Sequence, residues 1–186
     1  MSRRPQDAIA AIEAMFAERG GLIYGEHVTQ RQHALQCATF AERAGASPSL
    51  IVAALLHDVG HLLHRDAEAA LREGEDDHHE TIGAKYLGRW FAADVTAPIA
   101  LHVQAKRYLC IVEAGYRDLL SDVSKRSLEI QGGPMSNFDA AAFVGHAYVA
   151  AAVLVRRWDD HAKISDMDTP DLSYFLPYVE GCLVVR

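Results

Sequence analysis

The chain has 186 residues, of which 50% are hydrophobic and 23% are charged, and its formal net charge is −7. This composition excludes intrinsic disorder, which requires low hydrophobicity together with high net charge. The acidic balance argues against binding to nucleic acid, because that affinity comes from Lys and Arg side chains that replace counterions. The length is that of one domain, so we expect residues 1–186 to form a single domain.

The cysteines and the apolar segments predict a cellular compartment. The three cysteines are odd in number, lie far apart and form no CxxC pair: Cys37, Cys110 and Cys182. This usage is typical of a reducing compartment. Asp7 and Glu13 interrupt the apolar residues near the start, so we expect no signal peptide. The most apolar stretch, 147–155, is shorter than the ~20 residues of a membrane span. We predict a cytoplasmic protein without a membrane partner, and its oligomeric state is left open.

Apolar spacing predicts helices along nearly the whole chain. Residues 5–19 place Ile9, Ile12 and Phe16 on one face and precede Gly20-Gly21, a usual helix stop. The further predicted helices are 29–45, 48–64, about 79–91, one starting near Pro98, one or two within 115–130, and 137–158. Segment 65–77 is expected to be an exposed connection. The tail from residue 171 is ambiguous because Pro177 interrupts it.

Capping residues support several of these boundaries. Thr29 and Gln32 have the spacing of a capping box, Ser47-Pro48 provides a cap and a first-turn proline, and Asn137 is the expected cap of the last long helix. The helix over 48–64 is apolar almost all round, which is typical of a central helix in a helical core. Since no alternating run is long enough for a sheet, we predict an all-α single-domain bundle.

The pair His57-Asp58 is the most informative feature, because it interrupts the apolar sequence of this central helix. Burying an imidazole and a carboxylate without partners costs several kcal/mol. No Lys or Arg lies nearby on the helix, so a metal ion is the better partner, and a carboxylate can bridge two ions. The alternative is a hydrogen-bonded His–Asp pair in the core.

Further residues of ligand type occur among the ten histidines and along the helices. The order His33, His57-Asp58 and Asp159 resembles the metal signature of the HD-domain superfamily, an all-α fold of mostly metal-dependent phosphohydrolases. His79 and His102 match the ligands that its two-metal branches add. Five other histidines are interpreted as ordinary surface or core residues: His27, His64, His78, His146 and His161.

A more specific resemblance covers roughly residues 20–163. Several segments closely resemble those of the HD-domain mixed-valent diiron oxygenases that cleave carbon–phosphorus bonds: TQRQHALQCATFAER, LLHDVGH, HHETIGAKYL, HVQAKRYL, SKRSLEIQGGPM and RRWDDHAK. The resemblance implies one iron bound by His33, His57, Asp58 and Asp159. It implies a second iron bound by His79 and His102, with Asp58 as the bridge. Ligand types alone would equally allow manganese, cobalt or zinc.

Helical spacing also suggests a small anion site beside these ligands. His61 lies four residues after His57, Lys106 four residues after His102, and Arg156 three residues before Asp159, so each is expected to share a face with its ligand. In the resembled family, the phosphonate contacts match His61, Lys106, Ser124, Ser127 and Arg156, with Gln131 nearby. The alternative is that Lys106 and Arg156 are solvated, with Arg157 competing for the role of Arg156.

The sequence departs from the family pattern ahead of the first ligand. Members that act on a free amine carry a tyrosine, which covers the iron, three residues before a glutamate that receives the ammonium. Here the glutamate is Glu26, Ile23 stands three residues before it, and Tyr24 is one residue out of register. Ile23 and Tyr24 are therefore the candidates for covering the iron, although the one-residue offset is expected to point Tyr24 elsewhere. An apolar Ile23 favours a trimethylammonium group, which needs no hydrogen-bond acceptor.

The sequence hypothesis is an O2-dependent diiron oxygenase that converts 1-hydroxy-2-(trimethylammonio)ethylphosphonate to glycine betaine and phosphate. The alternative substrate is 2-amino-1-hydroxyethylphosphonate, which would give glycine. The resemblance implies two Fe ions and O2, and neither a nicotinamide nor a flavin is expected, because Gly132-Gly133 precedes a proline and does not open a helix after a strand. Other classes are a phosphohydrolase that activates water and a non-catalytic signalling module.

Overall fold

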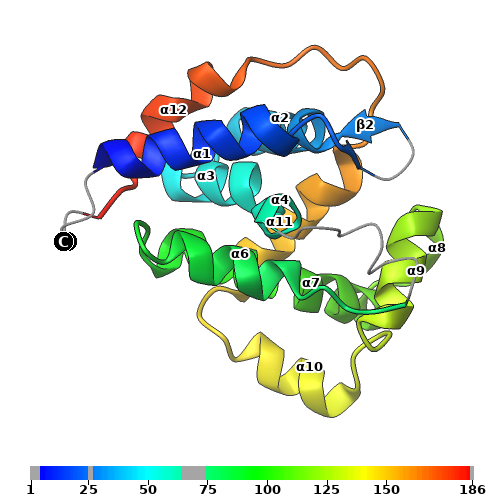
Figure 1. The fold of residues 1–186 in the computed structure, drawn as a ribbon. Helices are drawn as coiled ribbons and strands as arrows, with labels where there is room; N and C mark the ends of the chain where they lie inside the picture. The colour runs from blue at the N-terminus through cyan, green and yellow to red at the C-terminus, as the bar shows by residue number, and fades with distance from the viewer. Residues whose placement is uncertain (1–4, 25–26, 64–73, 185–186) are drawn as a thin grey trace.

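The computed structural model describes residues 5–24, 27–63 and 74–184, and it confirms the all-α fold (Figure 1). Its helices are α1 (Pro5–Arg19), α2 (Gln30–Arg43), α3 (Pro48–Leu56), α4 (Val59–Leu63), α6 (His79–Leu87), α7 (Ala93–Val112), α8 (Tyr116–Leu119), α9 (Asp122–Ile130), α10 (Asn137–Val144), α11 (Val149–His161) and α12 (Leu172–Gly181). In Figure 1, α1, α2, α3 and α12 form one half of the molecule, α6 to α10 form the other, and α4 and α11 lie between them.

The predicted central helix does lie in the core. Ser47 caps α3 by accepting a hydrogen bond from the Leu50 amide, and Pro48 occupies the first turn, where its missing N–H costs no helical bond. All side chains from Ile51 to Leu56 are buried. The main hydrophobic cluster surrounds them with residues from α1, α2, α6, α7, α11 and α12. α3 therefore holds the following residues, His57 and Asp58, in the centre of the molecule.

The prediction of one continuous helix over 48–64 is wrong. α3 ends at Leu56, His57 is its C-cap, and α4 begins at Val59 after a turn. The backbone of His57 stays helical at φ −60° and ψ −33°, so the angles of this residue do not mark the break. The His57-Asp58 pair thus lies in a turn between two short helices.

Other boundaries also differ from the prediction. α6 ends at Leu87, before Phe91, and α7 begins at Ala93, so that Pro98 lies inside the helix and does not start it. Ser136, not Asn137, caps α10 through the Asp139 amide. The predicted helix 137–158 is two helices, because a turn at 145–148 separates α10 from α11.

No single helix among the described residues has the length and apolarity to cross a membrane. α10 and α11 have sufficient length and apolarity only when they are taken together, and the pair is bent by 111° at the break between them. α11 packs along α7 and contributes with it to the three hydrophobic clusters. The two predicted short helices within 115–130 are present as α8 and α9, and the ambiguous tail contains α12 with Pro177 inside it.

A short hairpin precedes α2, although no sheet was expected. β1 (Ile23–Tyr24) pairs antiparallel with β2 (Val28–Thr29), so that Tyr24 lies opposite Val28. Thr29 then opens α2 through the predicted capping box with Gln32. Glu26, His64 and most of the predicted connection 65–77 lie outside the described residues.

Candidate metal centre

Six ligand-type side chains from five parts of the fold converge at the turn after α3. His33 comes from α2, His57 and Asp58 from the turn itself, His79 from the first residue of α6, His102 from the middle of α7 and Asp159 from the last turn of α11. All six are buried. These are the six residues that the resemblance implied as ligands, and the structure brings all of them together.

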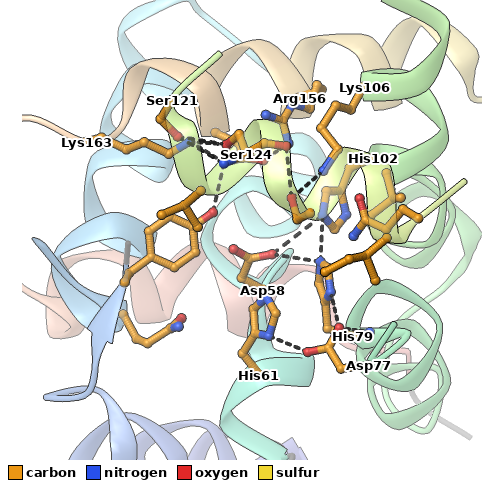
Figure 2. A pocket seen from close by; sticks show the side chains of 18 of the residues that line it. Asp58, His61, Asp77, His79, His102, Lys106, Ser121, Ser124, Arg156 and Lys163 are labelled. Carbon is orange, nitrogen blue, oxygen red and sulfur yellow. Dashed lines mark hydrogen bonds and ion pairs between the residues drawn. The ribbon is translucent and has the colours of Figure 1, made fainter. Parts of the chain in front are cut away.

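The nitrogen and oxygen atoms form two groups that share Asp58. In the first group, His33 Nε2 lies 3.3 Å from His57 Nε2 and 3.6 Å from Asp58 Oδ2. His33 Nε2 is also 3.5 Å from Asp159 Oδ1. In the second group, the Nε2 atoms of His79 and His102 are 3.2 Å apart, and each is 3.5 Å from Asp58 Oδ1 (Figure 2).

The Nδ1 atoms of the four histidines decide which ring nitrogen is left to bind a metal ion. Each Nδ1 faces a hydrogen-bond acceptor: Ala162 O for His33 at 2.7 Å, Ala54 O for His57 at 2.9 Å, Ile99 O for His102 at 2.7 Å and Asp77 Oδ1 for His79 at 2.9 Å. A neutral ring in this position carries its proton on Nδ1, which leaves Nε2 with the lone pair that can bind a metal ion. This is the usual outer support of metal-binding histidines.

Asp58 is the clearest sign that these groups can hold metal ions. Both of its buried carboxylate oxygens lack a hydrogen-bond partner among the described residues. A buried carboxylate that accepts no hydrogen bond is costly, and a cation between the donor groups removes that cost. The spacings of 3.2–3.6 Å are close to the distance of about 3.0–3.4 Å that separates donor atoms lying about 2.1 Å from one ion. The residues therefore fit a two-metal centre.

Burial and neighbouring charges keep His33, His102 and Asp159 in the protonation state that binds a metal ion. Burial lowers the pKa of His33 to about 4 and that of His102 well below its usual range, so both imidazoles are neutral. Burial opposes ionisation of Asp159, but Arg156 and Lys163 outweigh it and lower the pKa of the carboxyl. Burial also opposes protonation of His57, yet Asp58 and Asp159 raise its pKa to about 9. A metal ion would therefore displace a proton from His57.

His61 and Asp77 support the second group from outside. Asp77 accepts from His79 through one oxygen and lies 2.7 Å from His61 Nδ1 with the other (Figure 2). The ring of His61 stacks on that of His79 with centroids 3.9 Å apart. Gly60 allows this approach, because a Cβ atom there would lie 2.0 Å from the carbonyl oxygen of His79. Sequence reasoning did not identify Asp77.

A cavity of about 240 Å³ opens onto both groups. Its lining includes all the described substrate-contact candidates: His61, Lys106, Ser124, Ser127, Gln131 and Arg156. Lys106 is only 2% exposed, and its Nζ donates to Ser127 Oγ at 2.9 Å. Burial lowers the pKa of Lys106 to about 7. Gln131 Oε1 is buried and has no hydrogen-bond partner among the described residues.

Arg156 lies in the cavity wall but is already engaged by neighbours. Its Nη1 donates to Asp159 Oδ2 at 2.6 Å, its Nη2 to Asp160, and its Nε to Tyr116 Oη at 3.1 Å. Arg157 points away and pairs with Glu113. Tyr116 and Asp160 were not anticipated from the sequence, because they act through Arg156 and carry no motif of their own.

The expectation that Tyr24 points away from the centre is wrong. Its hydroxyl donates to Asp159 Oδ1 at 3.2 Å, and its ring stacks on His33 with centroids 3.8 Å apart. Alternation along β1 explains this, because neighbouring strand residues face opposite sides. Ile23 is the outward residue, 53% exposed, although it also lines the cavity. Glu26, the other residue of this pattern, lies outside the described residues.

His27 and Lys163 are among the cavity residues that sequence reasoning missed. His27, which was interpreted as an ordinary histidine, lines the cavity. Lys163 lines it too, and its Nζ donates to Ser124 Oγ at 3.1 Å. A position one turn after Asp159 could have signalled Lys163 by the same spacing argument that singled out Lys106.

Comparison with known proteins gives consistent results. The HD-domain family matches residues 31–111. The chain is 44% identical over 186 residues to a hydroxymethylphosphonate dioxygenase from Gimesia maris, covering 98% of this chain and 92% of the relative. It is 40% identical over 170 residues to the glycine-betaine-forming 1-hydroxy-2-(trimethylamino)ethylphosphonate dioxygenase from Leisingera caerulea, covering 91% and 87%. An uncharacterized protein from Acanthamoeba polyphaga mimivirus is 32% identical over 165 residues.

Proposed function

Because the chain belongs to the HD-domain family of phosphonate oxygenases, we propose that it uses O2 to cleave the carbon–phosphorus bond of a 1-hydroxyphosphonate at a centre of two iron ions. The observation that carries this proposal is the pair of donor groups that meet at the unpartnered carboxylate of Asp58. The reaction oxidises the hydroxyl-bearing carbon to a carboxylate and releases phosphate, so the substrate and O2 balance without a nicotinamide or flavin.

The proposed first iron is held by His33, His57, Asp58 and Asp159, and the second by His79 and His102 with Asp58 shared. Bound iron would supply the redox chemistry for O2, which matches the known use of two His and one carboxylate in non-haem iron oxygenases. Burial keeps His33 and His102 neutral, and their Nδ1 hydrogen bonds leave Nε2 as the donor atom for a metal ion. Tyr24 covers the first group by donating to Asp159.

The proposed phosphonate site is the wall formed by α7 and α9. Lys106 supplies a buried positive charge, and Ser124 and Ser127 place hydroxyls one turn apart on α9. His61, Gln131 and Arg156 are the further proposed contacts, and all three line the cavity. A substrate anchored here by its phosphonate has its hydroxyl-bearing carbon beside the donor groups, because the same cavity contains Asp58, His79 and His102.

The proposed substrate is 1-hydroxy-2-(trimethylammonio)ethylphosphonate, with glycine betaine and phosphate as products. The 40% identical relative is named for this reaction. The cavity lining also combines apolar Ile23 and Val28 with the carboxylates of Glu75 and Asp76, which suits a quaternary ammonium. The alternative amine substrate, 2-amino-1-hydroxyethylphosphonate, would depend on Glu26.

A second candidate substrate is hydroxymethylphosphonate, which the 44% identical relative is named for. This molecule lacks the ammonium end, so its reaction would leave the carboxylates of the cavity lining without a role. Formate and phosphate would be its products by the same oxidation.

The test is a comparison of kcat/KM for the three hydroxyphosphonates with iron-loaded protein, in air and under argon. We expect O2-dependent phosphate release that is fastest with the trimethylated substrate. Metal analysis should find two irons per chain. Equal phosphate release under argon from a phosphate ester would contradict the proposal and favour the phosphohydrolase alternative, as would a reproducible single zinc.

The cellular setting remains a proposal from the sequence. Three cysteines without a CxxC pair are typical of a reducing compartment, and we propose the cytoplasm. We propose that the protein is a cytoplasmic enzyme of one domain. Its proposed partner is a small organophosphonate.

A further inference from the structure

Hydrogen bonds from α2 hold the backbone on both sides of Lys163, although this residue lies beyond the end of α11. The preceding carbonyl, Ala162 O, accepts from His33 Nδ1 at 2.7 Å. The following residue, Ile164, makes two hydrogen bonds with the buried side chain of Gln36, at 2.7 and 3.0 Å. Two buried residues of α2 thus hold the backbone on both sides of Lys163, so its side chain starts from a defined point.

The two cavity lysines form matching pairs with α9. Lys106 Nζ donates to Ser127 Oγ at 2.9 Å, and Lys163 Nζ donates to Ser124 Oγ at 3.1 Å. Figure 2 shows the two lysines reaching this part of α9 from opposite sides. Ser124 and Ser127 are three residues apart and share a helix face. Each ammonium group has three N–H donors, and one hydroxyl engages only one of them.

The nearby carboxylates do not fully occupy Lys163. Asp159 Oδ1 is 3.8 Å from Lys163 Nζ, beyond hydrogen-bond distance, and it already accepts from Tyr24. Asp159 Oδ2 accepts from Arg156. Arg156 in turn donates hydrogen bonds to Asp159, Asp160 and Tyr116. The cavity thus contains two lysines whose closest partners are neutral hydroxyls, which is the arrangement expected for a dianion.

We propose that Lys163 is a further phosphonate-binding cation beside Lys106, and that the two Lys–Ser pairs together hold the phosphonate dianion. This inference rests on the proposed function, because it deepens the description of that same substrate site. It predicts that the site prefers a doubly charged tetrahedral group over a singly charged one.

The test measures binding of methylphosphonate to the iron-loaded protein by calorimetry, with methanesulfonate as the singly charged probe of similar shape. Lys163→Met should weaken methylphosphonate binding about tenfold or more, the range for a charged hydrogen bond. It should also reduce the preference over methanesulfonate. Lys163→Gln, which keeps a donor but not the charge, should resemble Lys163→Met, and Lys163→Arg should retain most of the affinity.

Lys85→Met is the matched control, because Lys85 is an exposed lysine on α6 outside the cavity lining, and it should leave the binding unchanged. Metal content is measured for every variant. Unchanged methylphosphonate binding in Lys163→Met, beside weaker binding in Lys106→Met, would overturn the role of Lys163 alone. Loss of iron in parallel with affinity would also overturn it, since Lys163 would then act through Asp159. No binding to the unmutated protein would overturn the phosphonate function itself.

Discussion

At the scale of single residues, Asp77 and Asp76 offer a sharp comparison. Asp77 accepts from His79 Nδ1, whereas its neighbour Asp76 pairs with His78. Removing a carboxylate behind a ligating histidine usually weakens metal binding about 10–100-fold. Asp77→Ala should weaken binding of one metal ion by that factor and leave the other unchanged, as measured by titration against a competing chelator. Asp76→Ala is the control, and equal affinities in the two variants would contradict the role of Asp77.

Lys106 predicts a pH dependence that also belongs to this scale. Its pKa is lowered to about 7, mainly by burial and secondly by Arg156. The ammonium that binds the phosphonate is therefore present below about pH 7 and lost above it. Since kcat/KM reports the free enzyme, it should fall as the pH rises above 7. Lys106→Arg should shift this fall to higher pH, because guanidinium stays protonated. A pH profile identical in both proteins would exclude Lys106 as its cause.

Residues with a motif could be predicted, and residues that act through others could not. His57 and Asp58 were singled out because a His–Asp pair in an apolar helix needs a partner, and the family resemblance implied the other four ligand candidates. Asp77, Tyr116 and Asp160 contact ligands or Arg156 and leave no pattern in the sequence. Tyr24 was misplaced because the direction of its side chain depends on a two-residue strand that no periodicity reveals.

At the scale of elements, the contact between α4 and α6 sets the spacing of the proposed metal sites. An added Cβ at Gly60 would meet the backbone of His79 at 2.0 Å, and one at Gly83 would meet the Gly60 amide nitrogen at 3.1 Å. Backbone atoms cannot rotate away, so Gly60→Ala must push α6 outward and carry His79 with it. Overpacking of this kind costs about 1–3 kcal/mol.

Gly60→Ala should therefore retain the metal of the first group and lose that of the second, giving about one metal per chain. Metal analysis after gel filtration, together with thermal unfolding, measures this outcome. Gly21→Ala is the control, because a Cβ there has no neighbour within 4 Å. Two metals per chain in Gly60→Ala would show that α6 adapts without moving His79.

The helices themselves were largely predictable, and their breaks were not. Caps at Thr29 and Ser47 marked two starts correctly, because a capping side chain leaves a local signature. The breaks before α4 and α11 escaped prediction because His57 and Gly145 keep right-handed helical backbone angles. Hydrophobic periodicity therefore runs through each break, while tertiary packing decides where the chain turns.

At the scale of the whole molecule, bound metal should contribute to stability, because its proposed ligands come from α2, the turn after α3, α6, α7 and α11. A ligand at a hundred times its Kd stabilises by about 2.7 kcal/mol per site. For a chain of this length, that corresponds to roughly 5–10 °C in Tm. Chelation should lower Tm by at least this amount, and anaerobic addition of Fe(II) should restore it. An unchanged Tm in calorimetry would contradict a metal centre built across the fold.

The hydrogen bond from Arg156 to Asp159 makes the two carboxylates of the centre unequal. Asp58 has both oxygens open, so it can give one to each ion. Asp159 has Oδ2 taken by Arg156, and Oδ1 is the oxygen that faces His33 at 3.5 Å. Asp159 would therefore offer a bound ion mainly Oδ1, the oxygen that also accepts from Tyr24. Arg156 would in this way shape the first proposed metal site without contacting the ion.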